Sequence, residues 1–267
     1  MLQQRVSSAI VLIPVVLGLT YLGGWPFFTL ILVATLLAGY EFYVLLANHG
    51  YHPASVLGLA LMAGLAVAAA QPNVHLGRLV LAAGVIVSLL WQIARSPARR
   101  SLSDWAVTVA GAVYIAGLAG FMISVRDLPN GFGWMMVIFL GTWASDSAAY
   151  VTGVYLAGRY LGRHAFAPTV SPNKTWEGSV AGWLAFTIVT TVLATYLGAP
   201  LLPSIALGIA AGILGTMGDL AVSVIKRQVG AKDSGNLIPG HGGMLDRIDS
   251  LLFVSVVVYY FVVWFVG

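Results

Sequence analysis

Long apolar runs alternate with short polar connections along almost the entire chain. Each run is close to the roughly 20 residues that a helix needs to cross a bilayer, and we count about nine of them. Every backbone polar group in lipid needs a partner, so helices are expected, and the runs are too long and too uniformly apolar for barrel strands. The sequence therefore predicts an all-α, polytopic integral membrane protein. The predicted transmembrane helices lie near residues 7–22, 26–47, 54–70, 78–94, 105–125, 134–157, 177–198, 203–224 and 250–266.

No internal repeat, low-complexity tract or soluble domain interrupts these runs. We predict a single transmembrane domain over residues 1–267, in which 1–130 holds the N-terminal helices. The segment 131–267 is expected to hold the helices and cytoplasmic loops that carry the chemistry. The chain starts with MLQQRVSSAI and enters an apolar run without a small-residue cleavage pattern, so a retained first helix is expected.

Composition supports the bilayer as the natural solvent. Hydrophobic residues make up 59% of the chain, with a mean hydropathy of +0.91, whereas soluble domains are about 45–50% apolar. Cysteine is absent, which excludes disulfides and thiol ligands. The net charge of +4 suggests nucleic acid at first sight, but the cations sit in short loops between apolar runs. Membrane topology explains them better, and no nucleic-acid partner is expected.

Basic residues favour cytoplasmic loops, and this bias sets the expected orientation. With the N-terminus inside, all of the 13 basic residues except Arg78 and Arg126 fall on the cytoplasmic side. We therefore expect a multi-pass protein of the inner (cytoplasmic) cell membrane, with its site facing the cytoplasm.

Three acidic residues lie within apolar runs, where a carboxylate costs at least ~2.5 kcal/mol and usually marks a site. Asp146 lies in TWASDSAAYVTG, and Asp219 is followed on the same helical face by Ser223 and Lys226. The alternative for each acid is a hydrogen bond that only joins helices, but both lie toward the cytoplasmic ends of their runs, which favours function. For Glu41, in AGYEFYVLL, a contact between helices or a place in the pocket lining is favoured over catalysis.

The segment VSPNKTWEG opens the seventh predicted helix. Ser171 and Pro172 are typical of an N-cap and a first helical position, which would direct free amides toward the site. Lys174 is then a candidate to neutralise a phosphate, and Glu177 to bind a metal or hold a cation. The alternative is an ordinary helix start with an interfacial lysine and Trp176 as a membrane anchor.

Charge is concentrated in the stretch 223–249, although only 8% of all residues are charged. The titratable residues in this stretch are Lys226, Arg227, Lys232, Asp233, His241, Asp246, Arg247 and Asp249. A Gly-His-Gly-Gly turn at 240–243 can present successive amides to an anion. Asp246 and Asp249 follow at i and i+3, and such hard oxygen ligands suit Mg²⁺. A helix cap is the alternative, and it accounts for one of the two acids.

This set of residues suits nucleotidyl transfer. Two polyanions must approach each other, so a metal ion and nearby cations lower the barrier electrostatically. The chain lacks a G-x-S-x-G elbow, an H-E-x-x-H helix and a Walker-type loop. His241 is a candidate general base, phosphate donor or loop-structuring residue, and a phosphate contact is preferred.

The run SVIKRQVGAKDSGNLIPGHGGMLDRID closely resembles the signature of the phosphatidate cytidylyltransferase, or CDP-diacylglycerol synthase, family. The helix around Asp146 and the element SPNKTWEG are similar to the same family, so the resemblance covers roughly residues 140–250. It implies that CTP reacts with phosphatidic acid to give CDP-diacylglycerol and pyrophosphate, with Mg²⁺ as cofactor.

Site residues are assigned from this resemblance together with the residue chemistry. The expected catalytic residues are Asp219, Asp246, Lys226, Lys232 and His241. The expected substrate-binding residues are Lys174, Arg227, Asp233, Gly242, Gly243, Arg247 and Ser223. The expected metal ligands are Asp219, Asp246, Asp249, Asp146 and Glu177.

The expected partners are CTP, phosphatidic acid and membrane lipids, and a homodimer is one alternative for the oligomeric state. Trp143, Tyr150 and Tyr155 are candidates to stack on a base, although packing is the commoner role of such residues. A CTP-dependent kinase for a polyprenol-type lipid would need the same cations and metal. An ion-coupled transporter is disfavoured because no two related halves with broken helices are visible.

Overall fold

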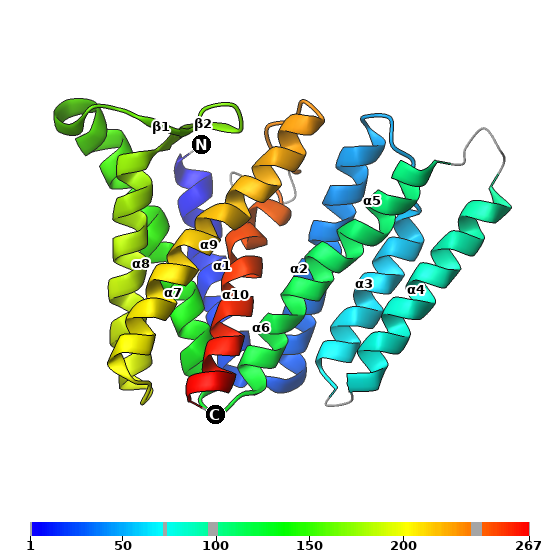
Figure 1. Ribbon diagram of the computed structural model, residues 1–267, viewed down its shortest axis with the longest axis horizontal. Coiled ribbons are helices and arrows are strands. Elements are labelled where there is room, and N and C mark those ends of the chain that lie inside the picture. The colour runs from blue at the N-terminus through cyan, green and yellow to red at the C-terminus, as the bar shows by residue number, and fades with distance from the viewer. Residues whose placement is uncertain (1, 72–73, 96–100, 236–241, 267) are drawn as a thin grey trace. The chain divides into compact units, whose positions relative to one another are not determined.

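The computed structural model describes residues 2–71, 74–95, 101–235 and 242–266, and it confirms an all-α, polytopic membrane protein. In chain order the elements are α1 Leu2–Leu22, α2 Gly24–Ala47, α3 Ser55–Ala69, α4 Val74–Ala94, α5 Leu102–Ala112, the π-helix η2 Val113–Gly117, α6 Leu118–Asp127, α7 Gly131–Val151, the π-helix η3 Thr152–Leu161, β1 Ala165–Ala167, β2 Ser171–Thr175, α8 Trp176–Tyr196, α9 Leu201–Gln228 and α10 Leu245–Phe265 (Figure 1).

Within the described ranges, six helical segments are long and apolar enough to cross a membrane. They are 24–47, 75–94, 102–127, 176–196, 201–228 and 245–265. The apolar part of α1 and the whole of α3 are shorter. The count of about nine spanning helices and the inward N-terminus stay predictions.

The chain forms two compact units. The first contains Met1–Ser124 and Gln228–Ile248, and the second contains Val125–Arg227 and Asp249–Gly267. The first division lies near the predicted boundary at residue 130, but the charged loop after α9 belongs with the N-terminal helices. The single-domain organisation stays a prediction.

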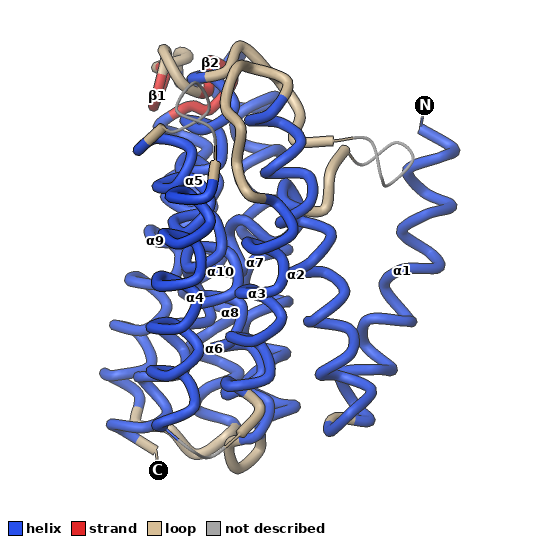
Figure 2. The backbone as a smooth tube through the Cα atoms, turned by 90° about the vertical axis from the view of Figure 1, so that its right-hand side faces the viewer, coloured by secondary structure: helices blue, strands red, loops and turns tan. Residues whose placement is uncertain are grey.

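In the first unit, α2 packs against α3 and α5. Figure 2 shows α1 close to α2 near the turn that joins them and farther away toward the N-terminus. Large side chains of α2 fill this core because small residues face them. A Cβ on Gly58 would overlap the buried ring of Tyr43, and one on Gly111 would overlap Phe42. The Tyr43 hydroxyl donates to the carbonyl of Thr108 at 2.6 Å. These contacts fix α2, which carries Glu41, against α3 and α5.

In the second unit, glycines let α8, α9 and α10 approach closely, as small residues do at helix crossings in membranes. A Cβ on Gly208 would lie 2.6 Å from the Thr187 Cα of α8. Farther along α9, a Cβ on Gly218 would lie 2.6 Å from the backbone oxygen of Asp249 in α10. Asp219 therefore follows directly after a point of backbone contact between two helices.

A short antiparallel hairpin, β1–β2, precedes α8, and it corrects one prediction. Ser171 and Pro172 lie in β2 rather than at the start of a helix. The N-cap is Thr175, whose Oγ1 accepts a hydrogen bond from the Gly178 amide at 3.1 Å. Strand pairing keeps residues 171–175 extended, so the helix can begin only after them.

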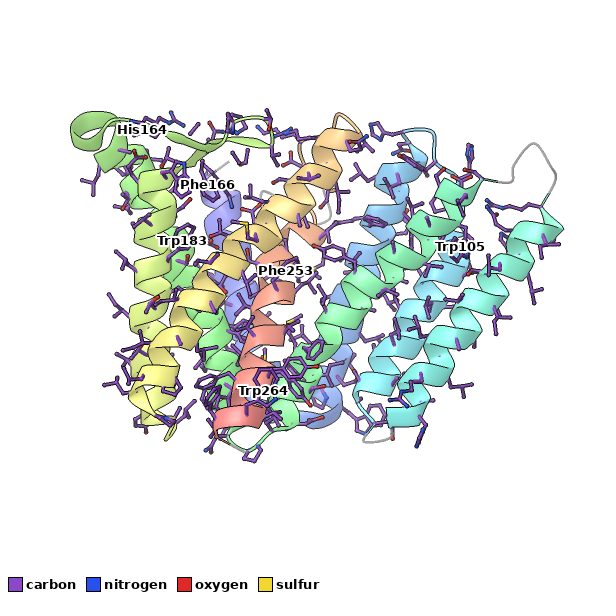
Figure 3. The ribbon with its side chains drawn as sticks, viewed as in Figure 1. Trp105, His164, Phe166, Trp183, Phe253 and Trp264 are labelled. Carbon is purple, nitrogen blue, oxygen red and sulfur yellow. The ribbon has the colours of Figure 1, made fainter. Side chains whose placement is uncertain are left out.

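Aromatic side chains fasten this hairpin to α8. Phe166 of β1 lies edge-to-face with Trp176, with ring centroids 4.5 Å apart. The ring centroids of Phe166 and Trp183 are 6.1 Å apart (Figure 3). Trp176 and Trp183 also lie edge-to-face. Trp176 is thus a packing residue of the hairpin, and its polar neighbours Asn173 and Lys174 are held in place at the end of β2.

Candidate active site

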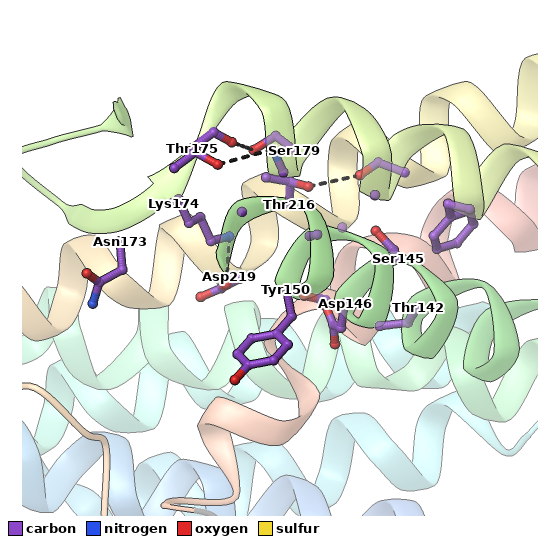
Figure 4. Close-up of a pocket in the computed structure, with 18 of the residues that line it drawn as sticks. Thr142, Ser145, Asp146, Tyr150, Asn173, Lys174, Thr175, Ser179, Thr216 and Asp219 are labelled. Atoms are coloured by element: carbon purple, nitrogen blue, oxygen red, sulfur yellow. Dashed lines mark hydrogen bonds and ion pairs between the residues drawn. The ribbon is translucent and has the colours of Figure 1, made fainter. Parts of the chain in front are cut away.

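The second unit contains a cavity of about 510 Å³, lined by parts of α7, η3, β2, α8, α9 and α10 (Figure 4). Several glycines lie in its walls, and they let the surrounding helices and the hairpin approach one another closely. The charged and hydroxyl side chains that line it are Thr142, Ser145, Asp146, Tyr150, Arg163, Lys174, Thr175, Ser179, Thr216, Asp219 and Ser250. The cavity thus brings together Asp146, Lys174 and Asp219, three of the candidate site residues from the sequence.

Lys174 and Asp219 form an ion pair in this cavity, with Nζ 2.6 Å from Oδ2 (Figure 4). Their side chains are 23% and 37% exposed, so solvent screens the pair and its contribution to stability is small. The Ser223 hydroxyl donates to the other carboxylate oxygen of Asp219 at 3.4 Å. The pair balances a carboxylate near the end of a membrane helix with a cation from the neighbouring hairpin.

Asp146 lies on α7, beyond the tight contact between α7 and α8. A Cβ on Gly182 of α8 would lie 2.9 Å from the Ser145 hydroxyl and 3.3 Å from Ala149. This close approach sets Asp146 and Tyr150, both exposed, at the cavity. Tyr150 lies edge-to-face with Tyr155, whereas Trp143 stacks on Phe139. A base-stacking role for Tyr150 stays a prediction.

Three further contacts hold the hairpin. Glu177 pairs with His164, with Oε1 2.5 Å from Nδ1, so the first turn of α8 is fastened to the residue before β1. Arg163 donates to the side-chain oxygen of Asn173 at 3.5 Å. Arg227 donates through Nε to the carbonyl of Val170 at 3.0 Å, which links the end of α9 to the hairpin turn. The predicted metal role of Glu177 and the substrate role of Arg227 stay predictions.

The loop after α9 belongs to the first unit, which includes Gln228–Ile248. Asp246 accepts hydrogen bonds from the Ser234 amide and hydroxyl, each at 3.0 Å. Glu41 accepts from the amides of Met244 and Leu245 at 2.8 and 2.9 Å and from the Ser234 hydroxyl at 3.1 Å. Glu41 therefore makes a contact with another helix, as the sequence predicted.

The remaining predicted residues differ in their surroundings. Lys232, Asp233 and Arg247 are exposed, as contacts with a soluble substrate would require. Asp249 is buried at 8% exposure, where α10 crosses α9. His241 lies outside the described residues. The assigned roles of these residues, and those of Lys226, Gly242 and Gly243, stay predictions.

Some cavity residues were not singled out from the sequence. Thr216 precedes Asp219 by three residues and so shares its helix face, a signal that periodicity could have supplied. Trp183 donates to the Thr216 hydroxyl at 3.0 Å. Asn173 is the neighbour of Lys174 in SPNKTWEG. Arg163 had no comparable signal, because its place depends on the pairing of β1 with β2.

The donor set of the cavity fits a hard divalent cation. Asp146 and Asp219 offer carboxylate oxygens, and nearby threonine and serine hydroxyls add neutral oxygens. No three His, Cys, Asp or Glu side chains in the described part of the chain come together as a complete metal cage. Mg²⁺ commonly uses one or two carboxylates and completes its shell with substrate phosphates and water. The residues present therefore fit such an ion.

A polytopic helical fold whose cavity holds a lysine, carboxylates and hydroxyl groups suits a membrane-embedded enzyme that acts on charged substrates. The chain belongs to the Cytidylyltransferase family, whose sequence model matches residues 3–265.

Relatives with curated names agree with this family. Phosphatidate cytidylyltransferase of Brucella suis is 34% identical over 268 residues, covering 97% of this chain and 93% of the relative. The protein of the same name from Synechocystis is 32% identical, covering 97% and 96%. That from Mycobacterium tuberculosis is 33% identical, covering 84% and 70%. The family resemblance in the sequence is thus confirmed.

Proposed function

We propose that this protein transfers the cytidylyl group of CTP to phosphatidic acid, giving CDP-diacylglycerol and pyrophosphate. Its family and the names of relatives that share 32–34% of their residues over nearly the whole chain support this activity. The structural observation that carries it is the Lys174–Asp219 pair at the edge of a polar cavity. In this pair, Lys174 offers a cation that can bind phosphate, and Asp219 offers a carboxylate that can bind a divalent ion.

In this reaction a phosphate oxygen of phosphatidic acid attacks the α-phosphorus of CTP. A bond forms between that oxygen and phosphorus, and the bond between the α-phosphorus and the bridging oxygen breaks, so pyrophosphate leaves with the electron pair. A phosphate monoester has a second pKa of about 6, so the attacking group is already ionised near neutral pH. The chain needs to supply orientation and charge compensation rather than a strong base.

We further propose that the enzyme uses Mg²⁺, with Asp219 and Asp146 in the cavity and Asp246 and Asp249 on α10 as ligands. The ion, when bound, would neutralise phosphate oxygens and so favour the approach of two anions. Lys174 would then exchange its contact with Asp219 for one with a substrate phosphate. Hydroxyls around the cavity would orient the same phosphates through hydrogen bonds.

We also propose that the site faces the cytoplasm from the inner membrane. Basic residues are concentrated in the loops that the predicted topology assigns to that side. A cytoplasmic opening would admit CTP, while the acyl chains of phosphatidic acid stay in the hydrocarbon region.

The experiment incubates the purified protein with radiolabelled CTP and phosphatidic acid, with and without Mg²⁺, and measures labelled lipid and pyrophosphate. We expect equal amounts of CDP-diacylglycerol and pyrophosphate, and only with Mg²⁺. Asp219→Asn should insert normally in the membrane but lose turnover. Release of CDP with a phosphorylated lipid would instead identify a kinase. Near wild-type synthesis by Asp219→Asn would contradict the metal assignment.

A further inference from the structure

Glu41 is a buried acid in the last third of α2, with only 4% of its surface exposed. An acid inside a membrane helix is costly and calls for compensation. Its carboxylate receives three hydrogen bonds, from the amides of Met244 and Leu245 and from the Ser234 hydroxyl. Leu245 is the first residue of α10 and Met244 directly precedes it, so both amides lie where a helix start offers donors without intrahelical partners and the helix dipole favours a negative charge. Glu41 thus acts as a helix cap supplied by a distant segment.

Two glycines show that the loop is shaped around this carboxylate. A Cβ on Gly235 would lie 2.7 Å from Glu41 Oε1. A Cβ on Gly243 would overlap both the Ser234 hydroxyl and Glu41 Oε2. Side chains at these two positions would displace the carboxylate. The glycines of this loop therefore make room for an acid of the protein itself.

Ser234 extends the contact from Glu41 to Asp246. Its hydroxyl lies 3.1 Å from Glu41 Oε2 and 3.0 Å from Asp246 Oδ2. The Ser234 amide also donates to Asp246 Oδ2 at 3.0 Å. Gly242, with φ of +78°, brings its backbone close to the same oxygen, since a Cβ there would lie 3.4 Å from it. The carboxylate of Asp246 is thus oriented by a loop that Glu41 holds.

We propose that Glu41 is a positioning residue for the reaction: by holding the start of α10 and Ser234, it fixes the carboxylate of Asp246 for binding the divalent ion. This inference rests on the proposed function, in which Asp246 is a metal ligand. Glu41 is not among the residues that line the cavity of the second unit. The amides of Met244 and Leu245 donate to Glu41, and the phosphate contact expected of the turn at 240–243 stays a prediction.

The decisive variant is Glu41→Gln, which keeps the size of the side chain. A glutamine has one acceptor oxygen, and its amino group would face an N–H donor, so at least one of the three hydrogen bonds is lost. We expect the Mg²⁺ concentration for half-maximal activity to rise about 10- to 100-fold, as when groups that orient metal ligands are changed. kcat should fall as well, whereas KM for phosphatidic acid should stay unchanged. If Glu41 only stabilises the fold, Glu41→Gln should lower the apparent kcat in proportion to the folded fraction. The Mg²⁺ concentration for half-maximal activity should then stay unchanged.

Asp104 provides a matched control. It is also a buried acid of the first unit, at 5% exposure on α5, and it accepts a hydrogen bond from the His52 amide at 2.8 Å. Its hydrogen bond fastens the 52–54 segment rather than the loop that carries Ser234. Asp104→Asn should lower thermal stability without changing the Mg²⁺ requirement. An equal rise in the Mg²⁺ requirement for both variants would overturn the inference.

A double variant tests the connection through Ser234. If Glu41 acts on Asp246 partly through this hydroxyl, Glu41→Gln combined with Ser234→Ala should raise the Mg²⁺ requirement by less than the product of the increases in the two single variants. Losses that multiply would show independent effects and overturn the proposed path.

Hydrogen exchange gives a readout that does not depend on activity. The amides of Met244 and Leu245 should be protected in the wild type and exchange faster in Glu41→Gln, and Mg²⁺ with CTP should raise the unfolding temperature less in the variant. A wild type that makes no CDP-diacylglycerol would refute the proposed function. An active Glu41→Gln variant with an unchanged Mg²⁺ requirement would refute the positioning role alone.

Discussion

Replacing Lys174 by methionine tests the cavity most directly, because the change removes the charge and keeps most of the side chain. In the free protein Nζ lies 2.6 Å from Asp219 Oδ2. If the same ammonium group binds a phosphate of CTP, the variant loses a hydrogen bond between charged groups, worth about 1.5–3 kcal/mol. Since about 1.4 kcal/mol corresponds to a factor of ten, kcat/KM for CTP should fall about 10- to 150-fold. Stability should change by no more than about 1 kcal/mol, because solvent screens the pair.

The assay measures kcat/KM separately for CTP and phosphatidic acid, together with the unfolding temperature in detergent. Lys174→Arg keeps the charge but cannot reproduce the compact ammonium group, so it should lie between wild type and Lys174→Met. Arg78→Met removes an exposed cation of α4 and should have no effect. If kcat/KM of Lys174→Met stays within about threefold of wild type, a difference of less than 1 kcal/mol, Lys174 does not bind phosphate.

Two further changes test how the fold supports the cavity. Thr175→Val removes the N-cap of α8 and should cost about 0.5–2 kcal/mol, seen as a lower unfolding temperature; an unchanged temperature would show that the Gly178 amide has another partner. Gly212→Val adds methyl groups where even a Cβ would lie 3.2 Å from Trp183 and Phe186, and overpacking of this kind costs about 1–3 kcal/mol. Gly18→Ala is its control, since nothing lies within 4 Å of that position, and equal unfolding temperatures for the two variants would contradict the packing argument.

The helices could be predicted closely from the sequence because hydropathy is a local property. The run at 26–47 corresponds to α2, Gly24–Ala47, and the run at 54–70 to α3, Ser55–Ala69. The sequence also placed Asp146, Asp219 and Lys174 on the predicted cytoplasmic side, because all three lie at or near the ends of apolar runs that the predicted topology directs to that side. A charged residue in an apolar run needs compensation, so its partner can be sought at the same depth.

Features that depend on pairing between segments could not be predicted in this way. Ser171 and Pro172 are typical of a helix start, but the pairing of β2 with Ala165–Ala167 overrides that preference. The π-helix at Val113–Gly117 interrupts a span that hydropathy describes as uniform, because a shifted hydrogen-bond pattern leaves the apolar composition unchanged.

Glu41, in the first unit, shows the same limit. The sequence correctly indicated a contact between helices, but it could not identify the partner. The groups that donate to Glu41 lie 193 to 204 residues farther along the chain. A glycine-rich turn followed by two acids is equally typical of a phosphate nest and of a loop that wraps an internal carboxylate. The close approach of Gly235 and Gly243 to Glu41 shows that this loop surrounds the carboxylate, whereas the phosphate contact of the turn at 240–243 stays a prediction.

The charges of the cavity also bear on the order in which ligands can enter. Lys174 and Asp219 compensate each other in the free protein, so an anion that binds Lys174 leaves Asp219 without its cation. A divalent ion that binds Asp219 leaves Lys174 without its carboxylate in the same way. Each ligand alone must therefore meet the cost of separating the pair, whereas a nucleotide that arrives with its metal ion replaces both contacts together. We expect the cavity to favour the metal–nucleotide complex over either component, because charge compensation is then maintained throughout binding.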